Sequence, residues 1–223
     1  MIKLQNVNKY FFKGDPREVH ALVDINLTIE EGEFSLFSGP SGCGKTTLLN
    51  VIGALDSIDS GKIFLYDREI GTLGENERTE LRLTNMGFVF QAYNLIPVLS
   101  VEENIGFIMK LRGFNDSEIK ARVLEVASML EIDKKLKSLP NALSGGQQQR
   151  VAVARAVAAK PKIILADEPT ANLDSKNSQS LMDMMKELNE KEGVSILFAS
   201  HDEMIRQRVK RIIRMNDGAL VDA

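Results

Sequence analysis

The sequence predicts an α/β fold: a mainly parallel sheet, an antiparallel β subdomain near the N-terminus and an inserted α-helical subdomain. Short apolar runs at Phe34–Ser38 and Ile163–Asp167 are typical of buried parallel strands that alternate with helices. Apolar residues at every second position of 23–29 predict a half-buried antiparallel strand. From residue 97 to about 138 the strand signal disappears, which indicates a helical insertion.

Local signals place the other elements. The alternating segment 2–7 predicts a first strand, and 62–66 and 86–90 predict two more, with a polar loop between them. Asp116 is a candidate N-cap for a helix with apolar residues at 119, 123, 126, 127 and 130. A later helix buries one face over 181–188 and ends at Gly193. The turn at 216–218 predicts a final hairpin.

The composition fits one globular protein of 223 residues, 43% of them hydrophobic, with a formal net charge of −3. Lysine and arginine are dispersed, so we expect no nucleic-acid partner. The single cysteine excludes an intrachain disulfide. We expect no signal peptide, because Met1 leads directly into the first strand, and no run reaches the roughly 20 apolar residues of a membrane span.

A glycine-rich loop follows the apolar run that ends at Ser38. Residues 39–46, Gly-Pro-Ser-Gly-Cys-Gly-Lys-Thr, match G-x-x-x-x-G-K-[ST], and 46–52 predicts the helix that must follow. In such a loop backbone N–H groups surround phosphates, Lys45 reaches the β- and γ-phosphates, and the Thr46 hydroxyl binds Mg²⁺. A chance glycine-rich turn is the alternative. The expected ATP contacts are Gly39, Ser41, Gly42, Cys43, Gly44, Lys45, Thr46 and Thr47.

A second anion site is predicted at residues 143–147, Leu-Ser-Gly-Gly-Gln, which precede a helix-compatible run. Here the chain resembles the ATP-binding-cassette (ABC) ATPases, whose signature is LSGGQ, over almost all of its length. The resemblance implies that Ser144, Gly146 and Gln147 of one copy close over the ATP held by another, in a head-to-tail dimer. It also implies a core of 1–91 and 156–223, and a helical subdomain of 92–155 that ends in the signature helix.

Asp167 ends an apolar strand, and the resemblance makes it the Walker B aspartate, a ligand of Mg²⁺. Glu168 is then the catalytic carboxylate that polarises the attacking water. By the same resemblance Gln91 contacts Mg²⁺ and the water, and His201 donates a hydrogen bond to the γ-phosphate. Asp174 belongs to the D-loop beside the partner's ATP, although a plain N-cap is an alternative that is compatible with this.

Two residue assignments have alternatives. The family stacks adenine on an aromatic residue near the end of the first strand, where Tyr10, Phe11 and Phe12 follow one another. The register of the opening pattern favours Phe11, and strand alternation puts its two neighbours on the other face. The Cys43 thiol is either activated by the loop's positive potential or simply a small residue.

The resemblance implies an ATPase subunit at the cytoplasmic face of the inner membrane, driving separate permease subunits. Residues 94–98 are the candidate contact with the permease subunits, or else form an apolar loop that packs inside the protein.

Residues 87–97 and the three glutamines at 147–149 most resemble the lipoprotein-release and macrolide-efflux branch. Lipoprotein release is the first expectation, then macrolide or peptide efflux, then the cell-division ATPase that regulates cell-wall hydrolases. Two alternatives are more remote. One is a soluble cassette ATPase of DNA repair or translation, and the other is a P-loop metabolite kinase. Ala171, Ser200 and Phe11 depart from the family's common residues, and nothing identifies the substrate.

Overall fold

The structure is a computed structural model that describes residues 1–221. By the density of its internal contacts the chain divides into two compact units. Unit 1 comprises residues 1–82 together with the described residues from Ser195 onward, and unit 2 is Leu83–Val194. The helical subdomain expected at 92–155 lies within unit 2, and its boundaries stay a prediction.

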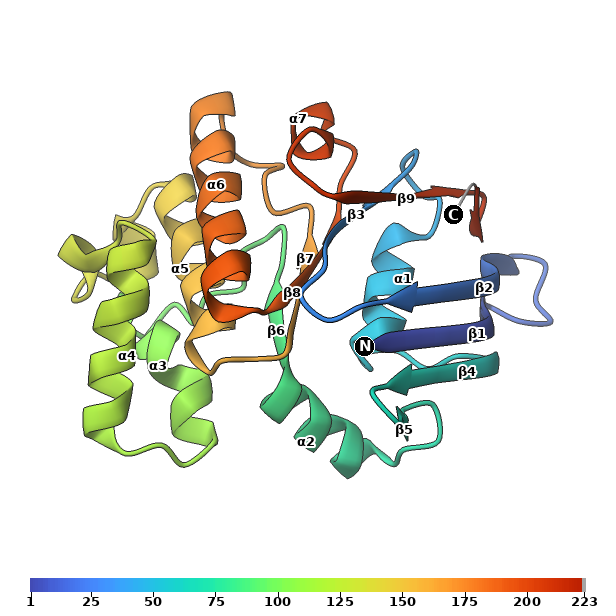
Figure 1. Cartoon of the computed structure of the whole chain (residues 1–223), viewed down its shortest axis with the longest axis horizontal. Coiled ribbons are helices and arrows are strands. Elements are labelled where there is room, and N and C mark those ends of the chain that lie inside the picture. Colours follow the sequence, from blue (N-terminus) through green and yellow to red (C-terminus); the bar gives the residue numbers. More distant parts are fainter. Residues whose placement is uncertain (222–223) are drawn as a thin grey trace. The chain divides into compact units, whose positions relative to one another are not determined.

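Unit 1 contains an antiparallel sheet with the strand order β2-β1-β4-β5 (Figure 1). One face of this sheet buries apolar side chains, among them Leu4, Ile25 and Ile63. Near its middle, β2 changes register: Asp24 has a φ of +45°, so Leu22 is buried whereas Val23 is only half-buried. The alternation expected through Val23 is therefore broken by a bulge-like irregularity. The strands are β1 (Ile2–Phe11), β2 (Val19–Ile29), β4 (Ser60–Leu65) and β5 (Arg68–Glu69).

Unit 1 also contains a mainly parallel set of strands, in which β3 pairs in parallel with both β8 and β9. All five side chains of β3 are buried, as expected for a central strand covered on both faces. The final hairpin is confirmed, with Gly218 at a φ of +79° in its turn. The elements are β3 (Phe34–Ser38), α1 (Lys45–Ile52), β8 (Ser195–Ala199), α7 (Glu203–Arg206), β9 (Arg211–Asn216) and β10 (Ala219–Leu220).

The polar stretch between β4 and β6 is not a loop throughout, because α2 (Glu75–Asn85) forms within it. Leu81 is the one buried residue of this helix. A helix that buries so little apolar surface lacks the periodic pattern by which helices are predicted, so the expectation of a loop was wrong here.

Unit 2 has two parallel strands, β6 and β7, and four long helices. Helix α5 packs against α3, α4 and β6 (Figure 1). Close packing to β6 requires Gly87, where a Cβ would lie 2.5 Å from the carbonyl oxygen of Ala156. The elements are β6 (Met86–Val89), α3 (Val101–Leu111), α4 (Asp116–Met129), α5 (Gly145–Ala158), β7 (Ile163–Asp167) and α6 (Ser175–Glu192), with short 3₁₀ turns at Asp133–Lys135 and Pro140–Ala142.

Side chains fix the ends of these helices. The N-cap of α4 is Asn115 rather than Asp116: its side chain accepts from the N–H of Glu118, and the Glu118 carboxylate accepts from the N–H of Asn115. Asn and Asp cap equally well, so composition alone could not choose between neighbours. Helix α6 ends as predicted at Gly193, whose φ is +67°.

Candidate nucleotide-binding site

The glycine-rich loop lies in unit 1, between the end of β3 and the start of α1. Gly42 and Gly44 have φ values of +80° and +102°, which disfavour any residue with a Cβ. Space is equally limiting, because a Cβ on Gly39 would lie 2.2 Å from the carbonyl oxygen of Met215 and one on Gly44 would lie 2.6 Å from that of Ala21. Gly42 is thus required by its backbone angle, Gly39 by close approach, and Gly44 by both.

Lys45 begins α1 and is buried. Its ammonium donates to the carbonyl oxygens of Gly39 at 2.8 Å and Pro40 at 2.9 Å, so the side chain lies back over the loop. The first turn of α1 contains no acidic residue, which leaves the positive end of the helix dipole available to an anion. Ser41, Gly42 and Thr46 are exposed beside it, and Thr47 is half-buried.

The Cys43 thiol is 97% buried, and its sulfur lies 3.8 Å from the Lys45 Nζ. A buried thiol is poorly accessible to oxidants or alkylating reagents, so the geometry favours packing over reactivity.

His201 is positioned in the same unit by strand pairing. β8 runs parallel to β3 with Ala199 opposite Phe37, and the N–H of Ser200 donates to the Phe37 carbonyl at 3.2 Å. The chain therefore leaves both strands at the same edge, where the glycine-rich loop begins after one strand and the exposed His201 follows the other.

The three candidate aromatic residues have different surroundings. Tyr10 stacks on the His20 ring with centroids 4.0 Å apart. Phe12 lies beyond the end of β1 with a φ of +54°, and Arg17 covers its ring. Phe11 ends β1, is 37% exposed, and has the Lys9 ammonium 5.3 Å from its ring centroid.

The signature sequence lies in unit 2 at the N-terminus of α5. Ser144 is the N-cap: its Oγ accepts from the N–H of Gln147, and the Gln147 side-chain oxygen accepts from the N–H of Ser144. This capping box forms the helix terminus and leaves Ser144 exposed. A Cβ on Gly145 would lie 2.9 Å from the Tyr93 hydroxyl, so a larger residue here would displace the end of the tyrosine side chain.

Asp167 and Gln91 also come together within unit 2, because β6 and β7 are parallel and Val89 lies opposite Ala166. Asp167 is half-buried at the end of β7, and Glu168 follows with a φ of +46°. Such an angle is uncommon for a residue with a side chain. Asn172 donates to the Gln91 backbone carbonyl at 3.0 Å, which ties the segment after β6 to the segment after β7.

Asp174 is the N-cap of α6, as the simpler of its two readings predicted, and accepts from the Asn177 N–H at 2.8 Å. The hydrogen bonds from the backbone and side chain of Asn177 lower the pKa of Asp174. The D-loop assignment is compatible with this cap.

The predicted residues thus form two groups: the glycine-rich loop, Phe11 and His201 on unit 1, and Gln91, the signature, Asp167, Glu168 and Asp174 on unit 2. Within the described part of the chain, His, Cys, Asp and Glu do not gather in threes as a metal cluster. The Asp167 carboxylate in unit 2 and the Thr46 hydroxyl in unit 1 are each oxygen donors of the kind that Mg²⁺ prefers, and Mg²⁺ takes few protein ligands.

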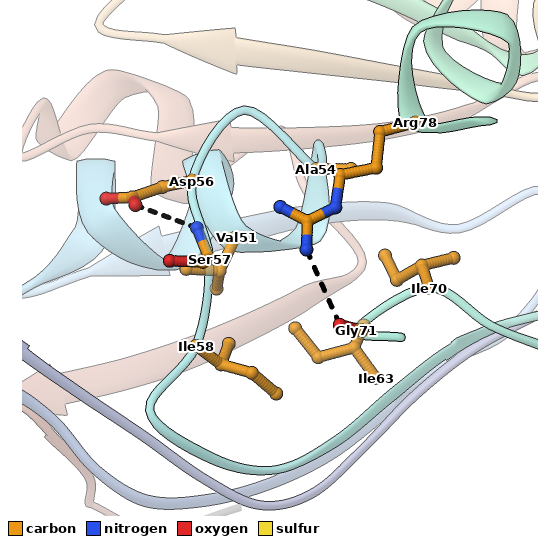
Figure 2. Close-up of a pocket in the computed structure, with 9 residues that line it drawn as sticks. All are labelled: Val51, Ala54, Asp56, Ser57, Ile58, Ile63, Ile70, Gly71 and Arg78. Carbon is orange, nitrogen blue, oxygen red and sulfur yellow. Dashed lines mark hydrogen bonds between the residues drawn. The ribbon is translucent and has the colours of Figure 1, made fainter. Parts of the chain in front are cut away.

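Two concave features lie outside these groups. A cavity of about 10 Å³ in unit 1 is lined by Ile58, Ile63 and Ile70, with Arg78 reaching over it to the Gly71 carbonyl (Figure 2). Such a volume holds about one water. In unit 2 a groove of about 670 Å³ lies between α3 and α4, and it is large enough for side chains of another protein.

Comparisons with known proteins agree with this arrangement. The sequence model of the ABC transporter family matches residues 22–171. An uncharacterized ABC transporter ATP-binding protein of Methanocaldococcus jannaschii, MJ0796, is 45% identical over 98% of this chain and 94% of its own length. Its solved dimer superposes with a TM-score of 0.92, covering 100% of this chain and 97% of that one at 42% identity.

Two relatives with more specific names are also similar. The lipoprotein-releasing system ATP-binding protein LolD of Paramagnetospirillum magneticum is 38% identical over 99% of this chain and 97% of its own. The macrolide export ATP-binding/permease protein MacB of Mannheimia succiniciproducens is 40% identical over 100% of this chain, which covers 34% of that protein.

The expected fold is confirmed: an N-terminal antiparallel sheet, a mainly parallel sheet carrying the phosphate loop, and a helical subdomain. Among residues 1–221, no helix is both long and apolar enough to cross a membrane. The chain belongs to the ABC transporter family and is an ABC ATPase.

Proposed function

We propose that this chain is the ATP-hydrolysing subunit that drives a separate membrane subunit, in a system that releases lipoproteins from the inner membrane. One observation carries the ATPase part: each of the two units presents a glycine-rich helix N-terminus, one with Lys45 and one with Ser144. Helix N-termini bind phosphate groups, so two such sites could bind one ATP from opposite sides when two chains associate. Two solved MJ0796 structures are dimers, one of them bound to ADP and Pi.

In this proposal Lys45 and the loop N–H groups hold the β- and γ-phosphates of ATP, and Ser144 and Gly146 of a second copy, with Gln147 capping their helix, approach the γ-phosphate. Phe11 stacks on adenine in this proposal, since Tyr10 is already stacked on the His20 ring and Phe12 lies beyond the end of β1. Asp174 would border the same interface. The dimer is head-to-tail, so each site needs both chains.

Glu168 is the proposed general base. It would orient and polarise the water that attacks the γ-phosphorus in line, while His201 donates a hydrogen bond to the γ-phosphate. Asp167, Thr46 and Gln91 would hold Mg²⁺, which neutralises phosphate charge when bound. The products are ADP and phosphate, and opening of the dimer after hydrolysis would deliver the mechanical step to the membrane subunit.

The proposed docking surface for that subunit is the groove between α3 and α4, together with residues 94–98. Its floor is apolar and includes Phe107, Ile119 and Val123, and its rim carries Glu102, Lys110 and other charges. An apolar floor with a charged rim fits an amphipathic helix. Val98 is 79% exposed, which favours contact over internal packing for the 94–98 segment.

Leu124 tests the docking surface, because it lines the groove and is 48% exposed. Leu124→Glu should abolish co-purification with the membrane subunit and leave ATP binding unchanged, since a charge in an apolar contact is costly to desolvate. Leu55→Glu is the matched control: Leu55 is 45% exposed, in unit 1 and outside the groove. If both variants retained the membrane subunit equally, the groove would not be the docking surface.

The identities to LolD and MacB, 38% and 40%, do not separate lipoprotein release from macrolide export, so we expect the membrane subunit to identify the substrate. The tagged chain should therefore be pulled down from detergent-solubilised membranes of its native host, and its partners identified by mass spectrometry. A membrane protein with a large periplasmic domain that binds lipoproteins supports the proposal. A macrolide-binding partner favours efflux instead, and soluble nucleic-acid or ribosome partners alone would refute the transporter assignment.

Phosphate release in the absence of an acceptor molecule would distinguish an ATPase from a P-loop metabolite kinase. The purified chain should release phosphate from Mg-ATP with water as the only acceptor. Strict dependence on an added small-molecule acceptor would contradict hydrolysis.

A further inference from the structure

The segment that follows Gln91 has an unusual backbone. Tyr93 and Asn94 are consecutive and both left-handed, with φ values of +60° and +48°. Asparagine tolerates this region, whereas a bulky tyrosine is disfavoured there. Two such residues in a row persist only where surrounding groups hold them.

Arg155 is the side chain that contacts both residues. From α5 its Nη2 donates to the Tyr93 carbonyl at 2.9 Å, and its Nη1 donates to the Asn94 carbonyl. Burial lowers the pKa of Arg155, but an arginine stays charged in proteins. Charge-assisted hydrogen bonds of this kind are stronger than neutral ones. One guanidinium thus spans the two left-handed residues.

The segment is attached on either side of this turn as well. Before it, Asn172 donates to the Gln91 carbonyl at 3.0 Å. After it, the fully buried Asn104 accepts from the Ile96 N–H at 2.8 Å and donates to the Ile96 carbonyl. The Tyr93 hydroxyl meanwhile lies against Gly145, at the first turn of α5. For the backbone between Gln91 and Ile96, Arg155 is the residue whose side chain provides the hydrogen bonds.

We propose that Arg155 is a positioning residue, which holds the Tyr93–Asn94 turn and thereby fixes Gln91 relative to the signature helix α5. The inference rests on the proposed function, in which Gln91 acts on Mg²⁺ and the attacking water and residues 94–98 contact the membrane subunit. Arg155 then links three elements of one unit: the catalytic glutamine, the membrane contact and the helix that reaches the partner's ATP.

A positioning role predicts a specific kinetic pattern. Gln91 is proposed to act on the water rather than to hold ATP, so Arg155→Met should lower kcat about tenfold or more and change KM for ATP by less than about twofold. Arg150→Met is the matched control. Arg150 lies on the same helix and makes a similar set of hydrogen bonds, to the Leu130 carbonyl, Glu131 and Ser180, away from the segment.

A direct readout of the segment is available because the chain has no tryptophan. Val98→Trp places one fluorophore at a position of the segment that is 79% exposed, and the anisotropy decay of this tryptophan reports the segment's mobility. Arg155→Met should increase that mobility and Arg150→Met should not. Adding Asn94→Gly to Arg155→Met should restore part of kcat, since glycine adopts the left-handed conformation without help.

The outcomes separate this inference from the proposed function. Unchanged mobility in Arg155→Met, or an equal loss of kcat in Arg150→Met, would overturn the positioning role. Gln91→Ala is measured in parallel: full activity in that variant would refute the catalytic role of Gln91, while the anisotropy measurement would still decide whether Arg155 holds the segment.

Discussion

At the scale of single residues, the candidate site divides into what a motif can predict and what it cannot. The glycines of the phosphate loop were predictable, because the positive φ angles of Gly42 and Gly44 and the close backbone approach at Gly39 and Gly44 are properties of the motif itself. Arg155 and Asn104 were not, because their partners are backbone carbonyls and amides that no side-chain pattern marks. Arg155 lies 62 residues from Tyr93 along the chain, so only the fold brings them together.

Gln149 gives a residue-scale prediction about stability. It is completely buried in α5, and neither polar atom of its amide has a hydrogen-bond partner among the described residues. A buried unpaired amide costs roughly 1–3 kcal/mol, whereas an apolar side chain of similar shape has no such cost. Gln149→Met should therefore raise the free energy of unfolding by about 1 kcal/mol, measured by urea denaturation. Gln147→Met, which breaks the capping box, should lower it. A lower stability for Gln149→Met would show that the amide is paired.

At the scale of elements, prediction succeeded where a helix or strand buries a full face. Helix α6 has seven buried residues on its inner side and ends at the predicted glycine. Helix α2 buries Leu81 alone and was missed. Register within β2 was also missed at Val23, because a bulge-like irregularity is set by pairing with β1 rather than by local propensity.

The cap of α6 predicts a pH dependence. Hydrogen bonds from Asn177 hold the pKa of Asp174 below its ordinary value of 3.8. The ionised carboxylate therefore stabilises the fold fully above that ordinary value, and the stabilisation is lost as the pH falls through the lowered pKa. Asn is an equally good N-cap and does not titrate, so Asp174→Asn should match the original chain near neutral pH.

The urea midpoints of the two proteins should be compared from about pH 6 down to about pH 3. The original chain should lose stability relative to Asp174→Asn at the acid end of this range. Parallel midpoints throughout would mean that the cap carries no charge-dependent stabilisation.

At the scale of the whole molecule, the sequence identified the family, because its phosphate loop and its signature are short contiguous motifs. The head-to-tail pairing of two copies is implied by the resemblance to the family and not by any residue pattern within one chain, so it needs a test of its own. The central proposal concerns assembly: each ATP would be held by Lys45 of one copy and Ser144 of another.

The most direct test is the mass of the Glu168→Gln variant in solution, by gel filtration with light scattering. With Mg-ATP bound but hydrolysis lost, it should run at twice the mass of the chain, and adding Ser144→Arg should return it to the monomer mass while ATP still binds. A monomer at saturating ATP, or a dimer that survives Ser144→Arg, would contradict the shared site.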